Sequence, residues 1–161
     1  MRPSASAAPR WFAVLALLCA LSVAFALTAQ HGFGMQPCPW CILQRLIIVV
    51  IGLVALGAAL VRADAMRLAA GSLIVLLSLG GAAAALWQHF VAASSASCNL
   101  TLADRIVGAT GLDMLWPQVF AAFATCADAA VKVAGVPFEF FSLALFVAAG
   151  TLAALLLRPR G

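Results

Sequence analysis

The chain has 161 residues, of which 66% are hydrophobic and only 9% are charged, and its formal net charge is +4. A soluble domain of this size needs far more polar surface, so the composition excludes an ordinary soluble protein and indicates an integral membrane protein. The positive charge lies mostly at the flanks of apolar stretches, so we infer no nucleic-acid binding from it. We expect one membrane domain over residues 1–161, with no separate soluble domain.

Four stretches are long and apolar enough to form membrane-spanning helices, each of which needs roughly 20 residues. They cover about residues 11–29, 42–61, 68–90 and 140–157. The first stretch could be mistaken for a secretory signal, but it is long for a signal core and residues 27–30 make a poor cleavage site. The sequence therefore predicts an all-α integral membrane fold, a bundle of four transmembrane helices.

Arginines mark one side of this bundle. They precede the first helix, bracket the turn between the second and third, and follow the fourth: Arg2, Arg10, Arg62, Arg67, Arg158 and Arg160. By the positive-inside rule this side is cytoplasmic, and both termini lie there. The opposite, outward side holds the loops 30–41 and 91–139, and disulfides persist on that side of the membrane.

The outward loops contain two pairs of cysteines. Cys38 and Cys41 form a Cys-x-x-Cys motif at the start of the second apolar stretch, and Cys98 and Cys126 lie in the long second loop. The fifth cysteine, Cys19, lies within the first apolar stretch, where we expect a small buried hydrophobic side chain.

Spacing alone leaves three interpretations of these pairs open: a redox relay, two structural disulfides or a zinc site. An oxidising compartment and the long step from Cys98 to Cys126 disfavour zinc, so we predict no metal. The positive end of a helix favours a thiolate in a Cys-x-x-Cys motif at its N-terminus, which increases the reactivity of the motif.

Arg45 follows Cys41 by one helical turn and shares its face of the helix. A charge at this depth in an apolar span is costly unless it is paired, hydrated or functional. The side chain could extend to the membrane interface. Alternatively, its guanidinium could stabilise a thiolate or donate hydrogen bonds to a carbonyl oxygen of a bound ligand.

The second outward loop contains a helical pattern of its own. Apolar residues recur at spacings of three and four at Leu112, Leu115, Trp116, Val119, Phe120 and Phe123. Pro117 predicts a helix start or a kink in this pattern. We expect a short amphipathic helix that lies on the membrane surface or packs on the bundle, and that holds Cys126 close to the Cys-x-x-Cys motif. The small polar residues before Cys98 predict a mobile segment that can reach a soluble partner.

Two motifs in the chain resemble signatures of the DsbB family, the disulfide bond formation protein B family. One is Gln-Pro-Cys-Pro-Trp-Cys-Ile-Leu-Gln-Arg at residues 36–45, and the other is Trp-Pro-Gln-Val-Phe at residues 116–120. The four-helix plan, the outward cysteine pairs and the short basic turn are also similar, so the resemblance covers nearly the whole chain. Gln44 is a modest departure, because some relatives carry a glutamate there.

The resemblance implies a quinone-dependent thiol oxidoreductase of the bacterial inner membrane. Cys98 would form a mixed disulfide with a periplasmic DsbA-type protein of thioredoxin fold, and Cys126 would be its bridge partner. Cys38 would exchange with Cys126, and Cys41 would face the quinone, either ubiquinone or menaquinone.

The same resemblance implies two further site residues. Arg45 matches the arginine that supports quinone binding, and His89, at the outer end of the third span, is similar to a histidine near the quinone pocket.

Two other functions remain as alternatives. The first is a non-enzymatic membrane scaffold held by two structural disulfides. The second is an enzyme of the vitamin K epoxide reductase type, which also couples cysteine pairs to a quinone. Those enzymes carry the Cys-x-x-Cys motif late in the bundle, whereas here it comes early, and this order favours the DsbB interpretation.

Overall fold

The structure is a computed structural model that describes residues 8–61, 63–94 and 101–157. Cys98 lies outside the described residues, as do Arg2, Arg62, Arg158 and Arg160.

Four long helices form the body of the molecule. They are α1 (Ala8–Gly32), α2 (Pro39–Leu60), α3 (Asp64–Phe90) and α7 (Glu139–Leu157). Each is long and apolar enough to cross a membrane, so the predicted all-α fold with four spans is confirmed. The first three helices begin earlier than the predicted stretches, because helical hydrogen bonding continues into flanks that hydropathy alone does not mark.

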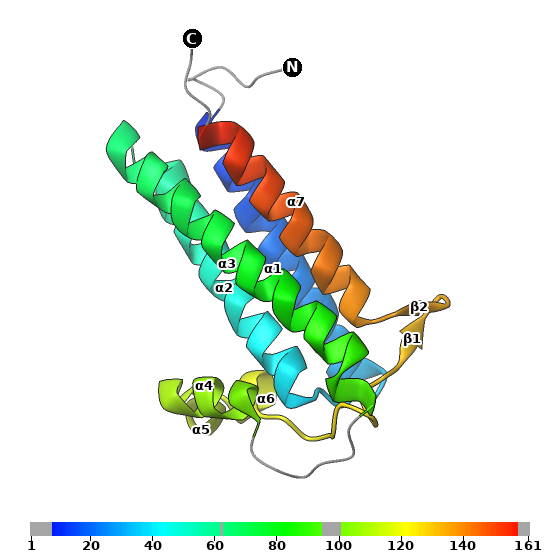
Figure 1. The fold of residues 1–161 in the computed structure, drawn as a ribbon. Coiled ribbons are helices and arrows are strands. Elements are labelled where there is room, and N and C mark those ends of the chain that lie inside the picture. Colours follow the sequence, from blue (N-terminus) through cyan, green and yellow to red (C-terminus); the bar gives the residue numbers. More distant parts are fainter. Residues whose placement is uncertain (1–7, 62, 95–100, 158–161) are drawn as a thin grey trace.

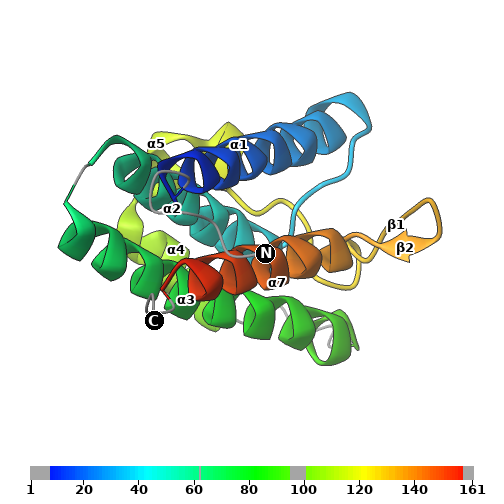
Figure 2. The ribbon, with the colours of Figure 1, turned by 90° about the horizontal axis from the view of Figure 1, so that it is seen from above.

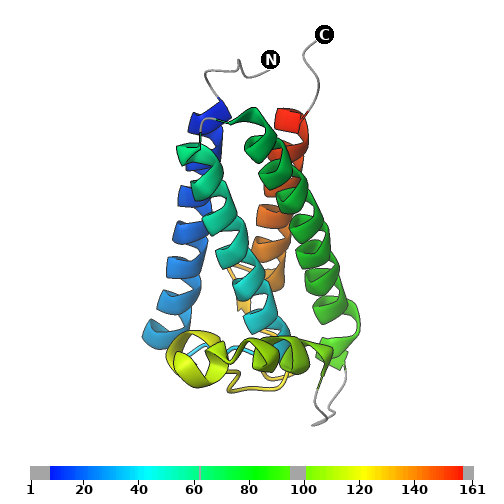
Figure 3. The same cartoon turned by 90° about the vertical axis from the view of Figure 1, so that its left-hand side faces the viewer.

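The four helices run antiparallel to their chain neighbours (Figures 1 and 3). The start of α1, the turn from α2 to α3 and the end of α7 lie at one end of the bundle, and the Cys-x-x-Cys motif lies at the other. Seen from above, α3 lies beside α7 and α1 beside α2, while α2 also packs against α3 (Figure 2). The arginine-flanked side and the cysteine side that the sequence predicted therefore correspond to the two opposite ends of the bundle.

Small residues let these helices approach closely. A Cβ atom at Gly81 in α3 would overlap the ring of Phe146 in α7. At Gly52 in α2, a Cβ would lie 3.0 Å from the Cβ of Cys19 in α1. Cys19 is itself buried in the central apolar core, as the sequence predicted.

The second outward loop folds across the end of the bundle as three short helices, α4 (Leu102–Thr110), α5 (Leu112–Leu115) and α6 (Pro117–Phe120). The predicted helical pattern from 112 to 123 is broken at Trp116, whose backbone has φ −134° and ψ 69°. Pro117 starts α6 because a proline is tolerated in the first helical turn, so the predicted start at Pro117 is confirmed.

The most regular of these helices, α4, was not predicted. It begins with a capping box between Thr101 and Asp104 and ends at Gly111, which has φ 68°. Ala103 and Val107 are buried where α4 packs on α2, whereas Met114 and Leu115 of α5 are exposed.

Two smaller elements complete the loop. A turn of 3-10 helix follows α3 at Ala92–Ser94. A hairpin of β1 (Lys132–Val133) and β2 (Val136–Pro137) precedes α7, and its turn residues Ala134 and Gly135 both have positive φ.

Candidate active site

Three of the predicted cysteines gather where α2 begins. Cys38 is fully buried and is the N-cap of α2, with its sulfur accepting the backbone N–H of Cys41 at 3.3 Å. The Sγ atoms of Cys38 and Cys41 are 2.7 Å apart, and both cysteines are free. Pro39 occupies the first helical turn, where its missing N–H costs little.

Cys126 contacts Cys38 from the second outward loop. The two lie in one buried cluster, and the interaction between their side chains raises the pKa of Cys38 and lowers the pKa of Cys126. The backbone N–H groups of Phe123 and Ala124 donate to the carbonyl of Pro37, at 3.0 and 3.3 Å. The loop is thus tied to the residue directly before Cys38, and the expected proximity of Cys126 to the Cys-x-x-Cys motif is found.

Of the contacting pair Cys38 and Cys126, Cys38 has the raised pKa and holds its proton more strongly. Hydrogen bonds to Cys126 and Cys41, together with burial, raise the pKa of Cys38. The hydrogen bond from Cys38 lowers the pKa of Cys126, against the opposing effect of burial. Cys38 therefore stands as a thiol between two sulfurs, and Cys126 is the better nucleophile of the contacting pair.

Arg45 is buried and does not extend to the interface. Only 6% of the residue is exposed, and Nη1 donates to Oε1 of Gln30 at 2.9 Å and to the carbonyl of Val119. Gln30 in turn donates to the carbonyl of Gln118 at 3.0 Å. Arg45 thereby connects α1, α2 and α6, while its Nε has no hydrogen-bond partner among the described residues.

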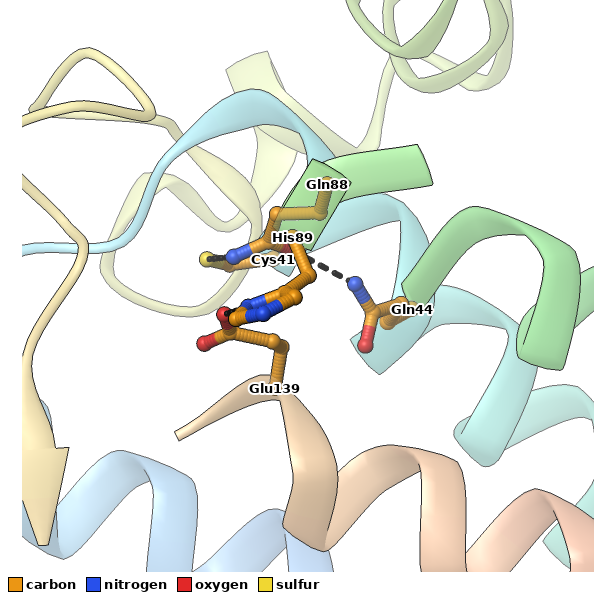
Figure 4. Close-up of polar contacts among 5 residues, drawn as sticks. All are labelled: Cys41, Gln44, Gln88, His89 and Glu139. Atoms are coloured by element: carbon orange, nitrogen blue, oxygen red, sulfur yellow. Dashed lines mark hydrogen bonds and ion pairs between the residues drawn. The ribbon is translucent and has the colours of Figure 1, made fainter. Parts of the chain in front are cut away.

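An amide chain reaches the sulfur of Cys41 (Figure 4). Nε2 of Gln44 donates to Oε1 of Gln88 at 2.6 Å, and Nε2 of Gln88 donates to Sγ of Cys41 at 3.2 Å. Gln88 comes from α3, and its donor on the sulfur supports negative charge there.

His89 and Glu139 form the second polar pair in Figure 4. Nδ1 of His89 lies 2.7 Å from Oε1 of Glu139. The Glu139 side chain is 4% exposed and its Oε2 has no partner among the described residues, whereas the His89 side chain is 32% exposed. The ring of His89 meets the edges of two phenylalanine rings, Phe90 and Phe140, at centroid distances of 4.9 and 4.8 Å.

These groups border one partly open cavity of about 60 Å³ at the cysteine end of the bundle. Its polar lining comes from Ser22, Gln36, Cys41, Gln44, Arg45, Gln88, Glu139 and Ser142. Apolar side chains supply most of the rest of the wall, among them Val23, Phe25, Ile48, Phe138 and Phe141. His89 is not part of the lining and reaches the cavity through Glu139.

The cavity suits a flat apolar ring that carries carbonyl oxygens. Such a ring needs apolar walls and hydrogen-bond donors at its oxygens. The unpartnered Nε of Arg45 and the neighbouring side-chain amides are donors, and the sulfur of Cys41 lies in the same wall. The lining therefore fits a quinone head group.

The sequence reasoning missed Gln30, Gln88 and Glu139 as site residues. Each is an isolated polar residue near the outer end of an apolar helix, and all three are buried. A buried polar group in a membrane span is costly unless it is paired or functional, so polarity at this depth was the available signal.

Comparisons with a family model and with individual relatives point to the same family. The family model described as "Disulfide bond formation protein DsbB" matches residues 8–156. The chain is 32% identical over 153 residues to the disulfide bond formation protein B of Nitrosomonas europaea, covering 92% of this chain and 93% of the relative. It is 35% identical over 134 residues to that of Ralstonia nicotianae, covering 83% of each chain. The protein of the same name in Azoarcus is 32% identical over 156 residues, covering 94% and 93%. No solved structure matches the chain.

Proposed function

Since the chain belongs to the DsbB family of disulfide bond formation proteins, we propose that it is a thiol:quinone oxidoreductase. Its substrate would be the dithiol of a DsbA-type protein of thioredoxin fold, which it returns to the disulfide. The electrons would pass through two cysteine pairs to ubiquinone or menaquinone in the membrane.

One observation carries this proposal: Cys38 contacts both Cys126 and Cys41, and Cys41 lines the cavity. Thiol–disulfide exchange needs a thiolate to approach the sulfur that it attacks. The three sulfurs form a continuous path from the outward loop to the cavity. Two independent structural disulfides would not require this contact between the pairs.

The first exchange takes place in the outward loop. With both pairs oxidised, a thiolate of the soluble partner attacks Cys98, forms a mixed disulfide with it and releases Cys126 as a thiolate. The second partner thiol then attacks its own cysteine in the mixed disulfide, which completes the partner's disulfide and releases Cys98. The lowered pKa of Cys126 makes it a good leaving group in this exchange.

The second exchange connects the pairs. The Cys126 thiolate attacks Cys38 in the Cys38–Cys41 disulfide, forms a Cys38–Cys126 disulfide and releases Cys41 as a thiolate beside the cavity. Attack of Cys98 on Cys126 then restores the Cys98–Cys126 bridge and releases Cys38. The Cys38–Cys41 disulfide then forms again as Cys41 gives up two electrons.

A bound quinone would be the acceptor of those two electrons. Arg45 would hold it through Nε, with Gln44 and Gln88 beside it, and the apolar wall would exclude water. Gln88 keeps a donor on the Cys41 sulfur while that sulfur is a thiolate.

We further propose that the protein lies in the bacterial inner membrane with both termini in the cytoplasm and the cysteines at the periplasmic face. Arg10 and Arg67 lie at the end of the bundle opposite the cysteines, in agreement with the positive-inside rule.

The proposal is tested with the purified protein, a reduced thioredoxin-fold partner and a soluble quinone analogue under anaerobic conditions. We expect the quinone absorbance to fall, and we expect Cys38→Ser, Cys41→Ser, Cys98→Ser and Cys126→Ser each to stop steady turnover. Cys19→Ala is the matched control, because Cys19 is buried in the core away from the cavity wall formed by Cys41. A scaffold protein would show no quinone reduction, and its cysteine variants would change stability alone.

A further inference from the structure

We propose that Glu139 is the proton donor of the quinone site and that His89 reprotonates it from the outer surface. The inference rests on the proposed function, because a quinone takes up two protons along with two electrons. It assigns the protons a route that is separate from the sulfur path of the electrons.

Glu139 has the position that a proton donor needs. It lies at the start of α7, lines the cavity and is the one carboxyl group among the described lining residues. Oε1 is held by His89 at 2.7 Å, while Oε2 is buried and has no partner within the described part of the chain. A buried carboxyl oxygen without a partner is costly, so an oxygen left free at a cavity wall indicates a ligand that completes its bonding.

Other polar groups in the described lining cannot take this role. The guanidinium of Arg45 stays protonated, and most of the other polar lining groups are amides and hydroxyls that do not ionise near neutral pH. These are Gln36, Gln44, Gln88, Ser22 and Ser142. Cys41 supplies electrons and must end as a disulfide sulfur. Among these polar groups, Glu139 is left as the one that can both give a proton and regain it.

His89 connects this carboxyl group to solvent. Its side chain is about one-third exposed, so one part of the ring meets the outside while Nδ1 faces Glu139. Imidazole can accept a proton at one nitrogen and release one from the other. The edges of Phe90 and Phe140 against the ring fix its orientation. His89 is thus a relay behind Glu139, and its predicted role shifts from contact with the quinone to supply of protons.

The proton balance closes over one turnover. Glu139 gives a proton to a carbonyl oxygen of the acceptor and becomes a carboxylate. His89 then takes a proton from the outer solution at Nε2 and releases its Nδ1 proton to that carboxylate, and return of the ring to its Nδ1–H tautomer prepares the next transfer. A second round supplies the second oxygen. Oxidation of the partner dithiol releases two protons to the outer solution, so the net reaction moves two hydrogens from the dithiol to the quinone.

The test is Glu139→Gln, which keeps the size and the polar contact with His89 but cannot give a proton. General acid catalysis typically contributes about 100-fold or more, so we expect kcat for quinone reduction to fall by roughly 100-fold. Two measurements should stay at the wild-type level. One is the dissociation constant of an unreactive quinone analogue, and the other is the rate at which the oxidised protein oxidises one equivalent of partner without quinone.

Two further variants separate proton transfer from structure. Glu139→Asp keeps the carboxyl group at a shorter reach, and we expect a kcat between those of wild type and Glu139→Gln with a larger solvent deuterium isotope effect than wild type. Thr151→Ala changes an exposed side chain of the same helix outside the cavity lining and removes no titratable group, and we expect wild-type turnover.

The outcomes of these experiments distinguish a failure of the Glu139 assignment from a failure of the proposed function. Wild-type kcat in Glu139→Gln would overturn the assignment while leaving the quinone reaction intact. Weaker analogue binding with unchanged kcat would make Glu139 a binding residue and would also overturn it. Should Glu139→Gln fail to fold, wild-type turnover and isotope effect in Glu139→Asp would refute the proposal. Absence of quinone reduction by the wild type itself would instead remove the proposed function, and the proton route with it.

Discussion

Replacing Arg45 by alanine removes the guanidinium from the cavity wall and breaks its hydrogen bonds to Gln30 and Val119. The proposed contact with quinone is a charge-assisted hydrogen bond from Nε, which is unpartnered in the structure. A hydrogen bond to a charged group contributes about 1.5–3 kcal/mol. At 1.4 kcal/mol for each factor of ten, the KM for quinone should rise roughly 10- to 100-fold.

The assay varies the quinone concentration at saturating reduced partner, and a titration with an unreactive analogue gives the dissociation constant directly. Oxidation of one equivalent of partner without quinone should keep its wild-type rate, because Arg45 takes no part in the first exchange. Gln30→Ala is the matched control. It removes the partner of Nη1, but Gln30 is not a lining residue, so its effect on KM should be much smaller. An unchanged KM in a correctly inserted Arg45→Ala protein would refute the assignment of Arg45 to the quinone.

The remaining predictions concern helix packing and the outer sulfur pair. Gly81→Ala should lower the free energy of unfolding by about 1–3 kcal/mol, because the added Cβ overlaps the Phe146 ring. Gly80→Ala is the control and should leave the free energy of unfolding unchanged, because nothing lies within 4 Å of a Cβ there. Equal losses of stability for both variants in an SDS titration would contradict the packing. The lowered pKa of Cys126 means that its thiolate persists to lower pH than that of an ordinary cysteine. In a Cys41→Ser/Cys98→Ser background, alkylation of the Cys126 peptide should therefore rise at lower pH with Cys38 present than in Cys38→Ala, and identical pH profiles would show that Cys38 does not donate to it.

The features that could be predicted, namely the membrane spans, the Cys-x-x-Cys motif and Arg45, depend on residues that are close together in the sequence. Apolar length defines a membrane span within one segment, and Cys38 and Cys41 belong to one motif at a helix start. Arg45 was found for the same reason, since a charge in an apolar run is visible without knowledge of the fold. Its burial was not predictable, because Gln30 and Val119 reach it from two other segments.

The features that the sequence did not reveal depend on contacts between distant segments. Glu139 meets His89 across 50 positions, and Gln88 reaches Cys41 across 47. The sequence places Glu139 at the boundary between the second outward loop and the fourth apolar stretch, but it does not show which residue will face the carboxyl group. The helix α4 was missed for a different reason. Its short apolar stripe is weaker than the 112–123 pattern, although the Thr101–Asp104 capping box and Gly111 mark both of its ends.

The contact between Cys126 and Cys38 is tested most directly by mapping disulfides in a quenched reaction without quinone. The fully oxidised protein is mixed with a reduced partner that lacks its second cysteine, acid stops the exchange, and peptide masses identify the bridges. We predict a mixed disulfide at Cys98 together with a Cys38–Cys126 bridge and a free Cys41. A mixed disulfide at Cys98 with Cys38–Cys41 intact and Cys126 free would contradict the electron path proposed for this protein.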